Sequence, residues 1–157
     1  MFRTVLAGAL AAVVMGLGMT AQAEVVSPED QIKLRKAGYS YMSWNMGKIK
    51  AQVIDQSVAY DQGQILAAAR TLDAIANSGM GALYGPGTDR QVGAQQTRVK
   101  PEMFDNFPDV AQLSAGLTAA TGKLVDAAEA DDRAALRTAF AEVGQSCKAC
   151  HDKYRQR

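Results

Sequence analysis

The sequence predicts an all-α protein whose four helices form an antiparallel, up-down bundle. Three observations carry this prediction. Apolar residues recur every three or four positions in four separate segments, residues typical of helix starts precede these segments, and no segment alternates apolar and polar residues as a strand would. Each amphipathic helix must bury one apolar stripe, and a bundle buries all four stripes together. An extended array of three helices is the alternative, but it would leave one stripe exposed.

The first 23 residues are expected to form a signal peptide rather than part of the fold. Arg3 supplies a positive charge, residues 5–19 are apolar, and Ala21-Gln22-Ala23 is a small-residue cleavage site. The apolar run is shorter than the ~20 residues that a membrane span needs. We therefore expect export to the periplasm, cleavage at about Ala23, no membrane anchor and one mature domain over residues 24–157.

The charge of the mature chain excludes one class of partner. Of the 17 Lys and Arg residues only Arg3 leaves with the signal peptide, so 16 remain against 16 Asp and Glu. The mature chain has no basic run and no basic patch interleaved with aromatic residues. It is not expected to bind nucleic acid.

The first helix is predicted from residue 28 to the low fifties. Ser27 can cap it, Pro28 suits its first turn, and Glu29 and Asp30 lie at the positive end of its dipole. Arg35 falls in the same register as the apolar or bulky residues of its inward face, which are Ile32, Tyr39, Met42, Met46, Ile49 and Val53.

The second helix is predicted to open at Asp61, with Gln64 completing its cap, and to close at Gly79. Its inward face comprises Ile65, Ala69, Leu72 and either Ile75 or Ala76. Residues 80–100 are too rich in glycine, with Pro86 among them, to continue as a helix. A loop of this length in a compact domain usually has a function or is disordered.

The last two helices follow this loop. Pro101 and Pro108 bracket the start of the third helix, and Pro108 either kinks that helix or marks its real start. Asp131-Asp132 caps the fourth helix. The predicted inward residues are Val110, Leu113, Leu117, Ala120, Leu124 and Ala127 in the third helix, and Leu136, Phe140, Val143, Cys147, Cys150 or His151, and Tyr154 in the fourth.

The fourth helix carries both cysteines and the only histidine of the chain, within the sequence CKACH. Cys147, Cys150 and His151 are spaced so that a helix projects all three toward its core-facing side. A structural zinc site normally needs four such ligands, and a thioredoxin-like redox pair would be expected beside a βαβ pattern. A plain disulfide would leave His151 unexplained.

The C-x-x-C-H spacing favours covalent attachment of one haem c. Two thiolates can add to the two vinyl groups of the haem while the next residue offers an imidazole to the iron. Export agrees with this, because bacteria attach c-type haem outside the cytoplasm. His151 is thus the candidate metal ligand.

A group on the other face of the haem must come from an earlier helix, because only six residues follow His151. The first helix is the candidate, since Arg35, Tyr39, Met42 and Met46 share one side of it. A buried Arg35 needs an anion, which a haem propionate would provide, and Lys36 could flank the same edge. Alternatively Arg35 reaches solvent at the end of the bundle, Lys36 is simply solvated, and the methionines fill the core.

Three segments together resemble the cytochromes c′, in particular those of purple photosynthetic bacteria. They are SPEDQIKLRKAGYSYMSWNMGKIK, GMGALYGPGTD and VGQSCKACHDKYR. The resemblance implies a bundle with haem held by Cys147 and Cys150, His151 as its single axial ligand and Arg155 beside that imidazole. It also implies that Tyr39 lies over the vacant iron face.

The resemblance has further implications outside the iron site. Thr97 or Arg98 would touch the haem edge, and a homodimer would form through the first two helices. Pro108 departs from the family's third helix.

This resemblance implies a periplasmic protein, not an enzyme, with five-coordinate high-spin iron. Such a protein binds NO or CO and can transfer one electron with a redox partner that the sequence does not identify. The main alternative is a six-coordinate, low-spin electron carrier in which Met42 or Met46 ligates the iron. A third possibility is a thiol redox or metal-delivery module without haem.

Overall fold

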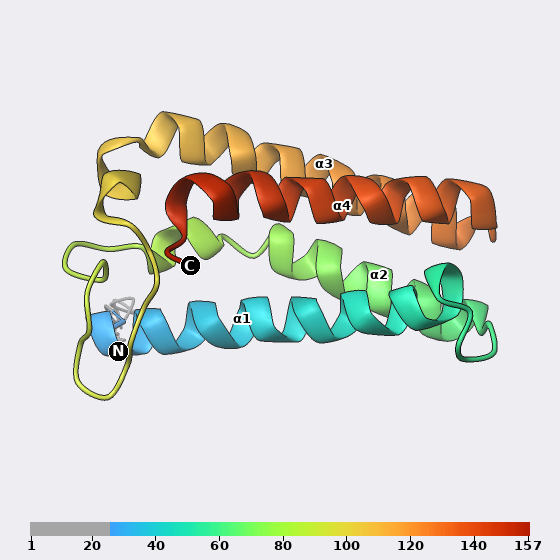
Figure 1. The fold of residues 1–157 in the computed structure, drawn as a ribbon, viewed down its shortest axis with the longest axis horizontal. Coiled ribbons are helices and arrows are strands. Elements are labelled where there is room, and N and C mark those ends of the chain that lie inside the picture. Colours follow the sequence, from blue (N-terminus) through green and yellow to red (C-terminus); the bar gives the residue numbers. More distant parts are fainter. Residues whose placement is uncertain (1–25) are drawn as a thin grey trace, which may run out of the picture.

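The computed structural model describes residues 26–157, which form an up-down bundle (Figure 1). The predicted signal peptide, residues 1–23, lies outside the described residues. The four long helices are α1 (Pro28–Ile49), α2 (Gln62–Ala76), α3 (Phe107–Glu129) and α4 (Arg133–Tyr154). A π-helical turn, Lys50–Ile54, extends α1, and 3₁₀ turns lie at Met80–Leu83 and Pro101–Asp105. No strand occurs among the described residues, so the predicted fold class is confirmed.

The helices start where the sequence predicts. Ser27 Oγ accepts from the Asp30 N–H (3.1 Å), Asp61 Oδ1 accepts from the Gln64 N–H (3.0 Å), and Asp132 caps α4. Pro108 lies in the first turn of α3, so it marks the start of that helix rather than a kink within it. These starts are local events, since each cap satisfies backbone N–H groups that the helix itself leaves unpaired.

The end of α2 differs from the prediction. The helix stops at Ala76, and Asn77 caps it. Gly79, predicted as its end, instead has a φ of 78° and leads into the 3₁₀ turn Met80–Leu83. Its left-handed conformation redirects the chain without the steric cost that a Cβ would add.

Burial is uneven along the bundle. In α3 the predicted inward residues near its start are only half-buried, namely Val110, Leu113 and Leu117, whereas the later ones are buried, namely Ala120, Leu124 and Ala127. In α4 the order is reversed: Leu136 and Val143 are fully buried, but Cys147 and Cys150 are half-buried. Because α3 and α4 are antiparallel, the incompletely covered positions share one end of the bundle.

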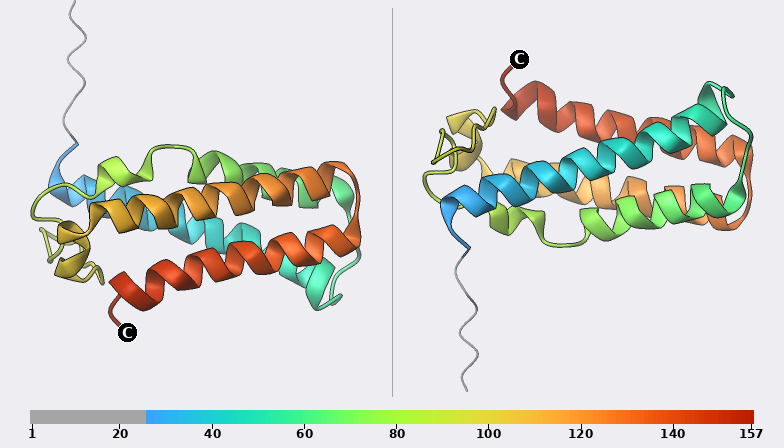
Figure 2. Two further views of the ribbon diagram at one scale, coloured as in Figure 1. Left: turned by 90° about the horizontal axis from the view of Figure 1, so that it is seen from above. Right: turned by 90° about the horizontal axis from the view of Figure 1, so that it is seen from below.

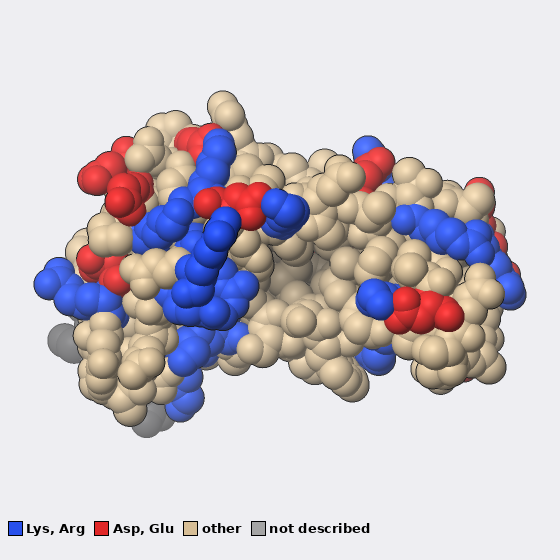
Figure 3. All heavy atoms as spheres, in the orientation of Figure 1, with Lys and Arg blue, Asp and Glu red and all other residues tan. Residues whose placement is uncertain are grey.

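That end is open between α1 and α4. α4 packs along α3, α3 along α2 and α2 along α1, but α4 reaches the first helix mainly through its π-helical extension Lys50–Ile54. Figure 2 shows the four helices running side by side, and in Figure 3 the surface is hollowed between α1 and α4. The hollow therefore lies where α4 leaves α1 incompletely covered.

The long loop after α2 wraps the end where α1 begins and α4 finishes (Figure 1). Side chains of α1 hold it: Glu29 Oε1 accepts from the Ala94 N–H (3.0 Å), and Gln31 Oε1 from the Gly85 N–H (2.9 Å). The loop is therefore ordered and positioned by α1. None of the helices among residues 26–157 is long and apolar enough to cross a bilayer.

Candidate functional site

The C-x-x-C-H motif occupies the penultimate turns of α4, beside the hollow. Cys147 and Cys150 are free thiols and half-buried, and burial raises the pKa of both. His151 is exposed, so the expectation that all three side chains face the core is wrong for this residue. The imidazole is therefore accessible from solvent. Among residues 26–157 no three His, Cys, Asp or Glu side chains converge as a metal cluster.

Asp109 of α3 fixes the last turn of α4. The Tyr154 hydroxyl donates to Asp109 Oδ2 (2.6 Å), and Lys153 Nζ lies 2.9 Å from Asp109 Oδ1. The carboxylate favours the protonated phenol and raises the pKa of Tyr154 to about 12. This pairing sets the position of the motif relative to the start of α3.

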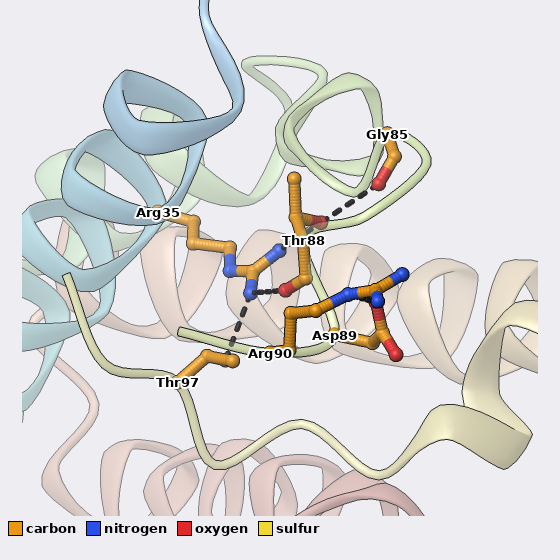
Figure 4. A network of polar contacts seen from close by, with 6 residues as sticks. All are labelled: Arg35, Gly85, Thr88, Asp89, Arg90 and Thr97. Carbon is orange, nitrogen blue, oxygen red and sulfur yellow. Dashed lines mark hydrogen bonds and ion pairs between the residues drawn. The ribbon is translucent and has the colours of Figure 1, made fainter. Parts of the chain in front are cut away.

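Arg35 lies across the hollow from α4, at 2% exposure, and is bound by the long loop (Figure 4). Its Nη1 donates to Leu83 O (3.1 Å) and Thr88 Oγ1 (2.8 Å). Its Nη2 donates to Thr88 O (2.5 Å) and Thr97 Oγ1 (2.8 Å). Arg35 therefore does not reach out to solvent, which was the alternative to anion binding.

All four acceptors of Arg35 are uncharged, and no carboxylate of the described residues lies within ion-pair distance of it. Burial lowers the pKa of Arg35, but a guanidinium remains charged in proteins. A buried cation without a counter-charge costs several kcal/mol. The site thus supplies an uncompensated positive charge, which suits an anionic ligand group.

Tyr39 of α1 faces the hollow. It is 39% exposed, although the sequence predicted an inward position, because α4 does not cover this part of α1. Partial burial raises the pKa of Tyr39, and the neighbouring Cys150 and Cys147 raise it further. The phenol of α1 and the two thiols of α4 thus influence one another electrostatically across the opening.

Tyr84 is a site residue that sequence reasoning missed. Its hydroxyl lies 3.5 Å from that of Tyr39, and the guanidinium carbon of Arg35 lies 4.4 Å from the centre of its ring. Burial raises the pKa of Tyr84 strongly. The one signal in the sequence was an aromatic residue within the glycine-rich segment GALYGPG. A large ring in such a loop indicates that the loop packs against another part of the protein.

The remaining candidates are divided between core, loop and surface. Met42 is buried in the apolar core at 5% exposure, and Met46 packs against that core. Thr97 contacts Arg35 directly, whereas Lys36 is exposed, with its Nζ 3.4 Å from Gln95 Oε1. Arg98 and Arg155 are both exposed. Lys36, Arg98 and Arg155, three of the cations proposed to lie at the haem, are therefore surface groups in this structure.

These features fit a covalently bound haem. A hollow bordered by half-buried apolar side chains can take a flat apolar macrocycle, the two thiols lie at its wall, and Arg35 offers an unneutralised cation for a propionate. A small metal ion would use none of the apolar surface. The residues present therefore match a porphyrin better than a metal cluster.

Known proteins resemble the chain over most of its length. The model of the family described as Cytochrome C′ matches residues 30–155. Cytochrome c′ of Allochromatium vinosum is 50% identical over 141 residues, which is 90% of each chain. The crystal structure of cytochrome c′ from Thermochromatium tepidum has 53% identity and a TM-score of 0.80, covering 85% of this chain and 99% of that one.

Three further solved relatives bear on ligands and assembly. One, 51% identical with a TM-score of 0.80 over 83% of this chain and 98% of its own, is described as a cytochrome c′ with a ligand-controlled dimer dissociation. Two are variants of Alcaligenes xylosoxidans cytochrome c′. The ferrous one with bound NO has 33% identity and a TM-score of 0.73, and the one with bound carbon monoxide has 34% and 0.74.

The family match over residues 30–155 and the relatives at about half identity confirm the resemblance carried by the three quoted segments. This chain belongs to the cytochrome c′ family, whose members bind haem c.

Proposed function

We propose that the chain is a periplasmic haem c protein whose iron is five-coordinate and high-spin, binds NO or CO, and exchanges single electrons. The observation that carries this proposal is the opening between α1 and α4, with Cys147 and Cys150 on one wall and Tyr39 on the other. When bound, the haem supplies a redox-active iron with room for a small diatomic ligand. The proposed role is binding and electron transfer rather than enzymatic catalysis.

Each residue of the site has a distinct task in this proposal. Cys147 and Cys150 hold the haem by two thioether bonds, and His151 offers its imidazole to the iron. Arg35, held by Thr88 and Thr97, pairs with a propionate, and Tyr39 covers the ligand face without bonding to it. Lys36, Arg98 and Arg155 add positive charge around the haem edge. The relatives with bound NO and CO support gas binding at such a site.

The low-spin alternative requires Met42 or Met46 to ligate the iron. Met42 is 5% exposed within the apolar core, and Met46 packs against the same core. To reach the hollow, Met42 would have to leave packing contacts that stabilise a buried side chain by about 1.5–3 kcal/mol. Tyr39, in contrast, is already partly exposed on the side of α1 that faces the hollow, which favours the open site.

Visible and resonance Raman spectra of the purified protein test the proposal directly. We expect a high-spin signature in both oxidation states and a new spectrum when the reduced protein meets CO. A six-coordinate, low-spin ferric spectrum would show that Met42 or Met46 closes the site. A colourless protein from a host able to attach haem would instead support the thiol module.

A homodimer through α1 and α2 is part of the same proposal. α1 carries an exposed apolar stripe at helical spacing, with Leu34 at 49%, Tyr41 at 51% and Trp44 at 55% exposure. The rings of Tyr41 and Trp44 stack at 5.3 Å, and Lys48 Nζ covers the Trp44 ring at 4.0 Å. A second copy of α1 would bury this stripe, and a relative's ligand-controlled dimer supports such an assembly.

Trp44→Glu is expected to dissociate the dimer, because it places a charge at the centre of the stripe. Sedimentation velocity at micromolar concentration should show a monomer for the variant and a dimer for the unaltered chain. Phe107→Glu is the matched control, since Phe107 is 47% exposed on α3 and an acid suits the first turn of a helix. If the two variants dissociate the dimer equally, α1 is not the specific interface. Sedimentation of the reduced protein with and without CO would show whether gas binding changes the monomer–dimer equilibrium.

A further inference from the structure

The C-terminus pairs with the end of the long loop. The Lys100 N–H donates to Tyr154 O (2.9 Å), the Gln156 N–H donates to Arg98 O (2.7 Å), and Val99 and Arg155 form an antiparallel bridge between them. Lys100 Nζ also donates to Lys153 O (2.9 Å). Loop residues 98–100 are thereby fastened to the turn of α4 that directly follows the C-x-x-C-H motif.

This pairing gathers four cations, Arg98, Lys100, Arg155 and Arg157, which we name the C-terminal basic patch. All except the half-exposed Lys100 are exposed, and no carboxylate of residues 26–157 lies within ion-pair distance of any of the four. The neighbouring Lys148 and Lys153, in contrast, are neutralised by Asp152 and Asp109. The patch therefore keeps its full positive charge although the mature chain is nearly neutral.

The patch borders the hollow. Figure 3 shows a band of Lys and Arg side chains over the C-terminal end of α4 and the loop beside it, next to the depression between α1 and α4. Uncompensated charge at the mouth of a cleft raises the local concentration of oppositely charged partners and speeds their association. Two backbone hydrogen bonds, which together make up the Val99–Arg155 bridge, hold these like charges side by side.

We propose that the C-terminal basic patch docks an acidic protein that exchanges one electron with the haem. The inference rests on the proposed haem site, because the patch borders the hollow in which the haem would be held. In the exchange, the reduced partner loses one electron and the ferric iron gains it, or the reverse, and no bond is made or broken. A membrane surface is the other occupant that a basic patch could take, and the vesicle measurement below distinguishes it from a protein partner.

The test measures electron transfer from a reduced, plant-type [2Fe–2S] ferredoxin, an acidic protein, to the ferric holoprotein by stopped flow. Lys100→Glu/Arg157→Glu reverses two charges of the patch without touching the residues assigned to the haem. Arg133→Glu/Arg137→Glu makes the same change in net charge at the opposite end of the bundle, where neither arginine has a carboxylate partner among the described residues.

At low ionic strength the patch variant should react about tenfold more slowly than the unaltered protein, and the control variant within about twofold of it. The difference should shrink between about 0.01 M and 0.15 M salt, as the Debye length falls from about 30 Å to 8 Å. The proposal is overturned if both variants react equally slowly, or if neither reacts more slowly than the unaltered protein. It is also overturned if the patch variant keeps its electron-transfer rate and loses only its binding to anionic lipid vesicles. CO binding by each holoprotein is measured separately as a test of the haem site. A holoprotein that does not bind CO would contradict the proposed function but not the docking of a partner at the patch.

Discussion

The double variant Cys147→Ser/Cys150→Ser is expected to be exported without covalent haem. Serine keeps the size and helix position of each side chain but cannot form the thioether bonds that the C-x-x-C spacing provides. The intact mass of the processed protein should lack one haem, and haem staining after denaturing electrophoresis should disappear. Each single variant keeps one thiol and should retain part of the stain. A double variant that still carries haem through denaturation would overturn the assignment of the attachment site.

The same double variant should also be less stable than the holoprotein. The end of the bundle that holds Val110, Leu113 and Leu117 is only half-buried by the polypeptide, and Arg35 there has only neutral partners. A bound haem would cover the apolar surface and supply a counter-charge, so its loss should lower the thermal midpoint by on the order of 10 °C. Circular dichroism during heating measures this difference. A midpoint equal to that of the holoprotein would mean that the haem contributes nothing to this end of the fold.

Local signals made most of the fold predictable. The caps at Ser27, Asp61 and Asp132 and the proline at residue 108 act within a few residues of themselves, and each prediction holds in the structure. The C-x-x-C-H motif is local as well, which is why the attachment site could be proposed from five residues. The end of α2 was missed because Gly79 turns the chain three residues after the helix has already closed.

Long-range contacts account for what the sequence did not reveal. Arg35 meets Thr88 and Thr97 across 53 and 62 residues, and Tyr84 meets Tyr39 across 45. The patch likewise joins Arg98 to the C-terminus, although neither segment is a basic run. Side chains from a loop of ordinary polar composition give no periodic pattern, so their partners become visible only once the bundle brings them together. The opening between α1 and α4 is also invisible in the sequence, because both helices carry ordinary apolar stripes.

Tyr39→Ala is expected to speed the association of CO with the reduced holoprotein by about tenfold, equivalent to about 1.4 kcal/mol of activation free energy. In the proposed site the phenol ring covers the ligand face, and a gas molecule binds only when the ring moves aside. Alanine removes that step. Flash photolysis of the CO complex, followed by rebinding in solution, measures the rate.

Tyr39→Phe separates blocking by the ring from any contribution of the hydroxyl. The Tyr84 hydroxyl lies 3.5 Å from that of Tyr39, well beyond the usual 2.7–2.8 Å of a strong O–H···O bond, so it restrains the ring only weakly. The phenylalanine variant should therefore bind CO within about twofold of the unaltered rate. If phenylalanine accelerates binding as much as alanine does, the Tyr84 contact rather than the bulk of the ring controls access. If neither substitution changes the rate, CO reaches the iron by a path that Tyr39 does not cover, and the gating role of this residue is wrong.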